Sequence, residues 1–196
     1  MPRRNWWKGC SLGAAGLAGL LLLATPLRAE GPAVVVELFT SQGCPACPPA
    51  DAFLAQLAAR DDVLALSLHV DYWDYIGWED TFATPANTAR QRGYAAAAGR
   101  EMLYTPQIIV NGVDHVVGTR ARDVTALIDK HLASDNEDIS VTLRREDGKV
   151  HLEARAAGQR ETPLVVRIAR YIPEATVAIA RGENAGRVLT YTNVVT

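Results

Sequence analysis

Runs of apolar residues alternate with polar turns along the chain, and their spacing changes between that of strands and that of helices. Residues 34–39 (VVVELF) form a β-branched apolar run typical of a buried strand. Residues 50–60 place apolar side chains on one helical face, and residues 63–70 form a second apolar strand. This order of strand, helix and strand predicts a βαβ unit whose two strands are parallel.

Residues 71–117 predict a loop, a helix and a β-hairpin. The loop covers residues 71–82, and Thr84 and Pro85 are typical N-cap and first residues of the helix that follows it. In the hairpin, Asn111-Gly112 is the turn between strands at residues 107–110 and 115–117.

A last helix is predicted after Thr119, which we expect to be its N-cap, with Val124 and Ile128 on the buried side. The resulting order β-α-β-α-β-β-α is the order of elements in thioredoxin. The sequence therefore predicts an α/β fold, with a thioredoxin-like mixed sheet and flanking helices.

The pattern changes after a polar linker at residues 134–138. Apolar and polar residues alternate on both sides of Asp147-Gly148, and further short strands are predicted at 165–171, 177–179 and 188–195. We expect a thioredoxin-like domain at 30–134 and a β-rich C-terminal segment at 139–196. Because the chain stops inside a predicted strand, we expect this segment to be truncated.

The N-terminus resembles an export leader. Basic residues precede an uncharged apolar run at residues 12–24, and Ala29 offers a small residue for cleavage, so we predict a signal peptide at 1–29. The run is shorter than the roughly 20 residues of a membrane span. A retained anchor is the alternative. Arg3-Arg4 also resembles a twin-arginine signal, so we expect a periplasmic or secreted protein without stable membrane insertion.

Removal of this leader changes both the charge and the cysteine content. The leader holds four of the 20 basic residues and none of the 22 acidic ones, which leaves a net charge of −6. Such a charge argues against a nucleic-acid partner. The leader also holds Cys10, so Cys44 and Cys47 are the two cysteines of the mature chain.

Cys44-Pro45-Ala46-Cys47 follows a predicted buried strand and precedes a helix. A cysteine at a helix N-terminus lies near free N–H groups and the positive end of the helix dipole, both of which stabilise a thiolate. We expect Cys44 to lie nearer the surface and attack, and Cys47 to resolve the mixed disulfide. Pro48 and Pro49 remove two donors, so the helix could begin after the cysteines.

Three functions fit this pair of cysteines. A redox-active dithiol predicts an exported thiol–disulfide oxidoreductase that acts on protein or small-molecule thiols and disulfides without a cofactor. A permanent disulfide predicts a non-catalytic binding module, and copper(I) binding with His69 as third ligand is the third possibility. The histidines lack the spacing of a zinc site, so no resident metal is predicted.

Two further sets of residues are candidates for the same site. Pro106 begins a strand, which makes the Thr105–Pro106 bond a candidate for the cis form; an ordinary trans proline at a strand edge is the alternative. Trp73 lies in an aromatic and acidic loop after the second strand, where open α/β sheets bind ligands. It is either a substrate platform or a core residue.

The strand, the Cys-x-x-Cys pair and the later Thr-Pro resemble the thioredoxin superfamily. That resemblance implies a cis Pro106 packed on the dithiol, with Thr105 hydrogen-bonded to a substrate strand. It also implies a buried acid behind Cys47. Glu37 is the candidate for this role, and the alternative is that Glu37 is a solvated or locally hydrogen-bonded carboxylate. Residues 35–51 (VVELFTSQGCPACPPAD), 69–74, 104–107 and 182–187 (GENAGR) are more specifically similar to a bacterial family of secreted thioredoxin-like proteins of unknown function.

Overall fold

The computed structural model describes residues 33–134, 139–158, 163 and 165–196, and the predicted leader lies outside the described residues. Helices and strands alternate in the first part of the chain, and strands alone follow. The elements are β1 (Val34–Thr40), α1 (Pro48–Leu57), β2 (Val63–His69), a 3₁₀ turn (Asp74–Ile76), α2 (Pro85–Ala97), β3 (Gln107–Val110), β4 (Asp114–Val117), α3 (Ala121–Leu132), β5 (Ile139–Glu146), β6 (Lys149–Ala156), β7 (Tyr171–Ala178) and β8 (Val188–Val195).

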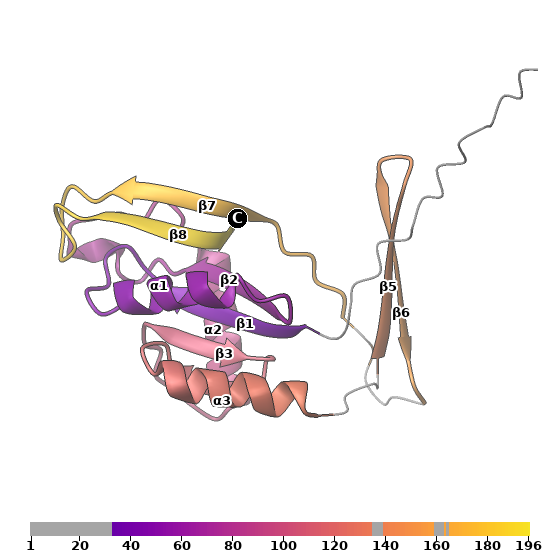
Figure 1. Ribbon diagram of the computed structural model, residues 1–196. Coiled ribbons are helices and arrows are strands. Elements are labelled where there is room, and N and C mark those ends of the chain that lie inside the picture. Colours follow the sequence, from indigo (N-terminus) through magenta and orange to yellow (C-terminus); the bar gives the residue numbers. More distant parts are fainter. Residues whose placement is uncertain (1–32, 135–138, 159–162, 164) are drawn as a thin grey trace, which may run out of the picture. The chain divides into compact units, whose positions relative to one another are not determined.

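Six strands form one mixed sheet in the order β4-β3-β1-β2-β8-β7 (Figure 1). β1 and β2 are parallel, with Val34 opposite Val63 and Thr40 opposite His69, which confirms the predicted βαβ unit. β3 runs antiparallel to β1, and β4 runs antiparallel to β3. The mixed α/β architecture predicted from the sequence is therefore present.

Helices cover both faces of the sheet. Alternate residues of β1 point to opposite faces, so Val36 and Leu38 pack with α1 and α3 whereas Phe39 packs on the α2 side. The buried residues of the first face are Val34, Val36, Leu38, Ala50, Leu54, Leu57, Val63, Ala65, Ile108, Val110, Val116, Val124 and Ile128. This arrangement leaves the carboxyl ends of β1 and β2, and the N-terminus of α1, together at one end of the sheet.

The C-terminal strand pair completes the main sheet. β8 lies parallel to β2, with Ser67 opposite Val194, and β7 lies antiparallel to β8. The side-chain amide of Asn193 donates a 2.9 Å hydrogen bond to the main-chain oxygen of Ala65, which ties the two strands together. Part of the predicted β-rich segment thus belongs to the same sheet as the dithiol.

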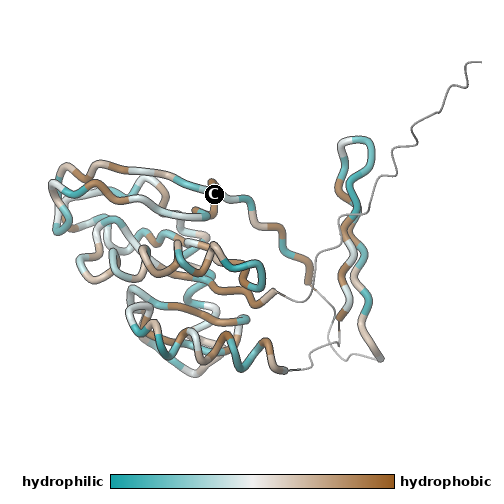
Figure 2. The backbone as a smooth tube through the Cα atoms, viewed as in Figure 1, coloured by the Kyte–Doolittle hydropathy of each residue, from teal (hydrophilic) through white to brown (hydrophobic). Residues whose placement is uncertain are grey.

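The other part of that segment is a separate two-stranded sheet formed by β5 and β6. Hydrophobic and hydrophilic residues alternate along it (Figure 2). Leu143 pairs with Leu152 on one face, and both are exposed. Asp147 and Gly148 have positive φ angles of 50° and 73°, so the predicted Asp-Gly turn joins these strands.

Several predicted boundaries are wrong. Instead of separate strands at 165–171 and 177–179, the structure has one strand, β7, at Tyr171–Ala178. Thr119 is not the N-cap of the last helix, because the N–H of Arg120 donates to Val117 O at 2.9 Å and the helix begins only at Ala121. Residues 165–170 are not a strand: Tyr171 pairs with Val195, so β7 begins where its partner β8 ends. Thr84 is the predicted N-cap of α2, and its hydroxyl accepts from the N–H of Asn87 at 3.1 Å.

The described helices are too short or too polar to cross a membrane.

Candidate functional site

A disulfide joins Cys44 and Cys47 where β1 leads into α1. The two Cα atoms are 5.4 Å apart, with two residues between the cysteines in the chain. Gly43 and Cys44 follow the carboxyl end of β1, and Cys47 is the N-cap of α1. The sulfur atoms therefore lie at the end of the sheet where the parallel strands β1 and β2 have their carboxyl ends.

Few backbone donors remain at this end of α1. The helix begins at Pro48, and neither Pro48 nor Pro49 has an N–H group. The N–H of Cys47 donates to Cys44 O at 3.3 Å. Of the two N–H groups that follow Cys44 before the helix, those of Ala46 and Cys47, only that of Ala46 has no partner among the described residues and could receive a thiolate.

Both cysteines are fully buried, so the expected outward position of Cys44 is wrong for the disulfide form. The reason is that two loops pack around the residues before it. Asn184, in the loop between β7 and β8, donates 2.9 Å hydrogen bonds from Nδ2 to the main-chain oxygens of Gln42 and Cys44. Gly43 lies against Trp73, since a Cβ added to that glycine would be 3.4 Å from Trp73 Cβ.

The loop between β7 and β8 approaches the aromatic loop closely. Gly182 has a φ of 78°, and a Cβ at this position would lie 3.1 Å from Trp78 Cβ. Trp78 donates from Nε1 to Gln42 Oε1 at 2.8 Å. Both loops therefore bind the turn that precedes Cys44.

The structure brings two of the predicted substrate residues together. Trp73 donates a 2.7 Å hydrogen bond from Nε1 to Thr105 Oγ1. Both side chains are partly exposed, and Trp73 contacts the residue before Cys44. The pair therefore connects the dithiol loop to the Thr105–Pro106 turn.

The Thr105–Pro106 bond is cis, as predicted. Pro106 packs close to α1: a Cβ added to Gly118 would lie 3.1 Å from both Pro106 Cβ and Ala50 Cβ. A side chain at Gly118 would therefore be tightly crowded by these neighbours. Pro106 is thus held beside the first turn of the helix that Cys47 begins.

Glu37 is buried but lies on the α2 side of β1. Its two carboxylate oxygens accept hydrogen bonds from Arg90 at 2.5 and 2.9 Å, and Tyr94 donates its hydroxyl to the same group. Its neighbours on the strand, Val36 and Leu38, point to the opposite face, towards α1. Glu37 is therefore engaged in an ion pair on the side of the sheet away from α1.

A different buried acid lies behind Cys47. Asp51 is four residues further along α1, so the two side chains share a helix face, and Asp51 N–H donates to Cys47 O at 3.1 Å. Thr40 donates its hydroxyl to Asp51 Oδ1 at 2.8 Å, while Oδ2 has no partner among the described residues. Burial raises the pKa of Asp51 to about 7, against the opposing effects of His69 and Thr40.

His69 and Asp80 form a second buried polar pair near Asp51. His69 Nδ1 lies 2.7 Å from Asp80 Oδ2, and both side chains are fully buried. The same carboxylate oxygen accepts a 2.7 Å hydrogen bond from the N–H of Gln42. The ring of Tyr191, from β8, packs edge-on against His69 with a centroid distance of 4.7 Å. His69 is thus part of the support of the dithiol loop.

Asp51 also lines a cavity of about 350 Å³ between α1 and β8. Pro48 and Pro49 form one wall, and Arg187 and Val188 contribute to the other. In the described part of the chain, no group of three or more His, Cys, Asp or Glu side chains is placed to hold a metal ion.

Residues 35–196 match the family described as "Protein of unknown function (DUF1223)". The chain belongs to the DUF1223 family. The match covers all the helices and strands described above, including β8, except for Val34, the first residue of β1.

A similar solved structure is the crystal structure of protein AGR_C_4864 from Agrobacterium tumefaciens. Its sequence is 38% identical, the TM-score is 0.70, and the similarity covers 85% of this chain and 72% of the other. No curated protein gives a significant match to this DUF1223 chain.

The sequence pattern missed two residues of this DUF1223 site. Asp51 reads in the sequence as an ordinary acid in the first turn of a helix, although its position four residues after Cys47 places it on the cysteine's face. Asn184 lies in the GENAGR segment, whose polar and glycine residues predict only a loop. Its contact with Cys44 depends on how β8 joins the sheet.

Proposed function

We propose that this DUF1223 protein has a thioredoxin-like fold and is an exported thiol–disulfide oxidoreductase that uses Cys44 and Cys47. The observation that carries the proposal is the disulfide at the junction of a parallel strand and a helix, with a cis proline packed beside that helix. A buried acid on the same helix face as Cys47 adds the group needed for proton transfer.

In the proposed reaction, the Cys44 thiolate attacks one sulfur of a partner disulfide. A Cys44–partner bond forms, and the other partner sulfur leaves as a thiolate and takes up a proton. Cys47 then loses its proton and attacks Cys44, which forms the Cys44–Cys47 bond and releases the second partner thiol. Two electrons pass from the protein to the partner, and the reverse sequence oxidises a dithiol.

We propose that Asp51, and not Glu37, accepts the proton that Cys47 loses. Asp51 has a free carboxylate oxygen and a pKa of about 7, so it can exchange a proton near neutral pH. Asp51 also lines the cavity of about 350 Å³ between α1 and β8. Glu37 already has Arg90 and Tyr94 as partners.

Protein or small-molecule thiols and disulfides are the proposed substrates, and Thr105 and Trp73 the residues that contact them. We propose a periplasmic or secreted location reached through the leader at residues 1–29. Replacement of Arg3-Arg4 by two lysines should block export by the twin-arginine route, and unchanged export of that variant would indicate the general secretory route.

The decisive experiment equilibrates the native protein with glutathione mixtures and counts alkylated cysteines by mass spectrometry. An oxidoreductase should pass from disulfide to dithiol within the glutathione range without denaturant. In the reduced protein, Cys44 should be alkylated first at neutral pH. Cys47→Ser should accumulate mixed disulfides, and Cys44→Ser should abolish exchange; a bridge reduced only in denaturant would refute the proposal.

A non-catalytic binding module with a permanent disulfide is the second candidate. The complete burial of both cysteines favours it, because thiol exchange requires access to sulfur. In that case Cys44→Ser and Cys47→Ser should lower stability equally, trap no partner and leave the binding of partners intact.

A further inference from the structure

Strand β4 is an edge of the six-stranded sheet, and one side of its backbone has no strand partner in the described part of the chain. The hydrogen bond from Gly118 N–H to Pro106 O, at 2.9 Å, fixes which groups face that side. Bonded and non-bonded pairs alternate in an antiparallel ladder, so Val116 and Asp114 bond to β3. His115 and Val117 therefore point their backbone groups away from the sheet.

Three of these four outward groups are available. Val117 O already accepts from the N–H of Arg120 at 2.9 Å. The N–H and C=O of His115 and the N–H of Val117 have no partner among the described residues. An extended peptide can bond to unpaired backbone groups of this kind and so add a new strand to the sheet.

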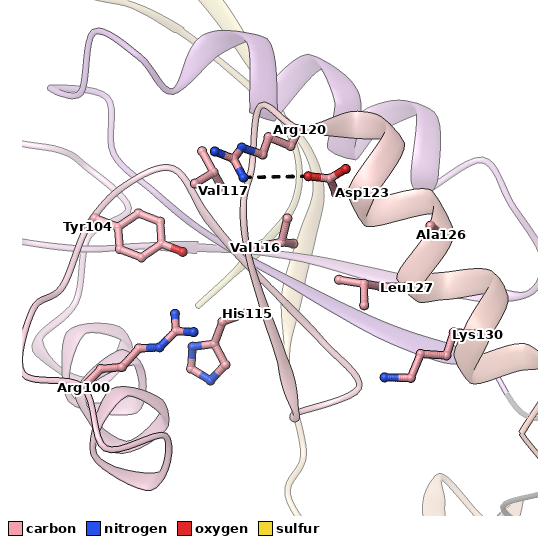
Figure 3. Close-up of a pocket in the computed structure, with 10 residues that line it drawn as sticks. All are labelled: Arg100, Tyr104, His115, Val116, Val117, Arg120, Asp123, Ala126, Leu127 and Lys130. Atoms are coloured by element: carbon pink, nitrogen blue, oxygen red, sulfur yellow. Dashed lines mark ion pairs between the residues drawn. The ribbon is translucent and has the colours of Figure 1, made fainter.

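A cavity of about 650 Å³ extends over this edge (Figure 3). His115, Val116 and Val117 all line it. Because successive side chains point to opposite faces of a sheet, three consecutive residues can line one cavity only if it lies along the strand's edge. α3 borders the cavity on one side of β4, and Arg100 and Tyr104 border it on the other (Figure 3).

The walls of this groove carry more positive than negative charge. Arg100, Arg120 and Lys130 line it, against the single acid Asp123. Arg120 lies 3.9 Å from Asp123, and both are well exposed, so this pair is weak and screened. Lys130 lies 3.1 Å from Asp114, next to the groove. Acidic residues outnumber basic ones in the whole chain, so this local excess is a distinct feature of the edge.

The imidazole ring of His115, which lines the groove, adds little to this positive charge at neutral pH. Burial and the nearby Arg100 lower the pKa of His115, against the opposing effect of Asp114. Its ring lies on the α2 side of the sheet, 6.3 Å from the ring of Tyr94. The positive charge therefore comes from the three permanent cations, two beside α3 and one beside Tyr104.

We propose that an acidic, extended segment of a partner protein binds in this groove and adds to β4 as a further strand. Its main chain would bond to His115 and Val117, and its alternating side chains would face Arg100 on one side and Arg120 and Lys130 on the other. This interaction is independent of the dithiol chemistry. The Val117 end of the groove leads to Gly118, which packs on Pro106.

Fluorescence anisotropy with labelled seven-residue peptides tests this interaction. The probe contains glutamate and valine, with acids on both faces of the extended chain. One comparison peptide has lysine in place of each glutamate, and the other is the glutamate peptide N-methylated at alternate residues. We expect the glutamate peptide to bind at least about tenfold more tightly than either comparison peptide. Binding should be equal for oxidised protein and for the Cys44→Ser variant, so that failure of the redox proposal does not affect it.

Protein variants test the location of the site. The double variant Arg100→Glu and Lys130→Glu should reverse the preference between the two charged peptides, whereas the matched control Arg92→Glu, on exposed α2 surface outside the groove, should not. Hydrogen exchange should slow at the amides of His115 and Val117 when the glutamate peptide is bound. Equal binding of the glutamate, lysine and N-methylated peptides, or equal effects of the groove and control variants, would overturn the proposal.

Discussion

Asn184 hydrogen-bonds Cys44 across 140 residues of sequence, with its Nδ2 2.9 Å from the main-chain oxygen of the cysteine. The same amide nitrogen donates to Gln42 O, and its oxygen accepts from Arg187 at 3.0 Å. Asn184 therefore bonds to the backbone from which the sulfur of Cys44 extends, and fixes that backbone in place.

Asn184→Ala should change the redox equilibrium of the dithiol as well as stability. Loss of two buried hydrogen bonds should lower the free energy of unfolding by about 1–3 kcal/mol. Because the bonds hold the loop in its disulfide form, we expect the glutathione equilibrium to shift towards the dithiol by at least about threefold. Quantitative alkylation at fixed glutathione ratios measures this shift.

Asn193→Ala is the control, since the side-chain amide of Asn193, in β8, also donates a 2.9 Å bond to a main-chain oxygen, that of Ala65, away from the dithiol. This variant should lower stability in chemical denaturation and leave the glutathione equilibrium unchanged. Equal shifts in both variants would mean that loss of stability alone moves the equilibrium.

Asp51 should make stability depend on pH between about 4 and 7. Burial raises the pKa of this carboxyl from 3.8 to about 7, so the folded state holds a proton that the unfolded state loses. The stability that Asp51 contributes is then fully present below about pH 4 and is lost as the pH rises to about 7, by at most about 1.4 kcal/mol per pH unit. Asp51→Asn should remove this slope in urea unfolding measured across that range, and an unchanged slope would show that another group titrates.

The ion pair of Glu37 and Arg90 should support the fold without affecting the dithiol. Arg90→Ala leaves a buried carboxylate without its cation, which should cost about 3 kcal/mol of unfolding free energy. The exposed pair of Arg60 and Asp62 gives a control, because Arg60→Ala should cost at most about 1 kcal/mol.

Glu37→Gln tests directly whether Asp51 or Glu37 accepts the proton of Cys47. Alkylation of Cys47 in the reduced protein should have the same pH profile in this variant as in the unmodified protein, whereas Asp51→Asn should shift the profile. A shift in the Glu37→Gln variant would return the proton-transfer role to Glu37.

Thr105→Val and Trp73→Phe should both weaken the use of large substrates. Each change removes one partner of the 2.7 Å hydrogen bond between these residues. We expect KM for a peptide disulfide to rise by about fivefold with kcat nearly constant, and the rate with glutathione disulfide to stay the same. Steady-state assays with the two substrates distinguish this result from a general loss of activity.

Local sequence patterns predicted most of the elements of the main sheet. The apolar run at Val34–Thr40 and the Asn111-Gly112 turn depend on neighbouring residues, and the structure contains both. The position of Pro106 at a strand start made its bond a candidate for the cis form, and the resemblance to the thioredoxin superfamily implied that form, which the structure contains. Such features are encoded within a few residues of the chain, so one sequence is enough to find them.

Features that depend on distant contacts could not be predicted in this way. The residues of β8 predict a strand, but nothing in them indicates that this strand pairs with β2, with Val194 opposite Ser67. The burial of Cys44 follows from that pairing, because it brings Asn184 to the loop. Asp51 has a raised pKa for a similar reason: the packing of α1 against the sheet buries a carboxyl that a lone helix would expose.

The parallel pairing of β2 with β8 also sets an order of events during biosynthesis. A chain that emerges from its N-terminus presents Cys44 and Cys47 long before Asn184, so both thiols are synthesised well before the loop that packs over the dithiol turn in the finished fold. Strand pairs between residues this far apart form slowly. The interval between the two events gives cellular oxidants and reductants access to sulfur atoms that the finished fold encloses.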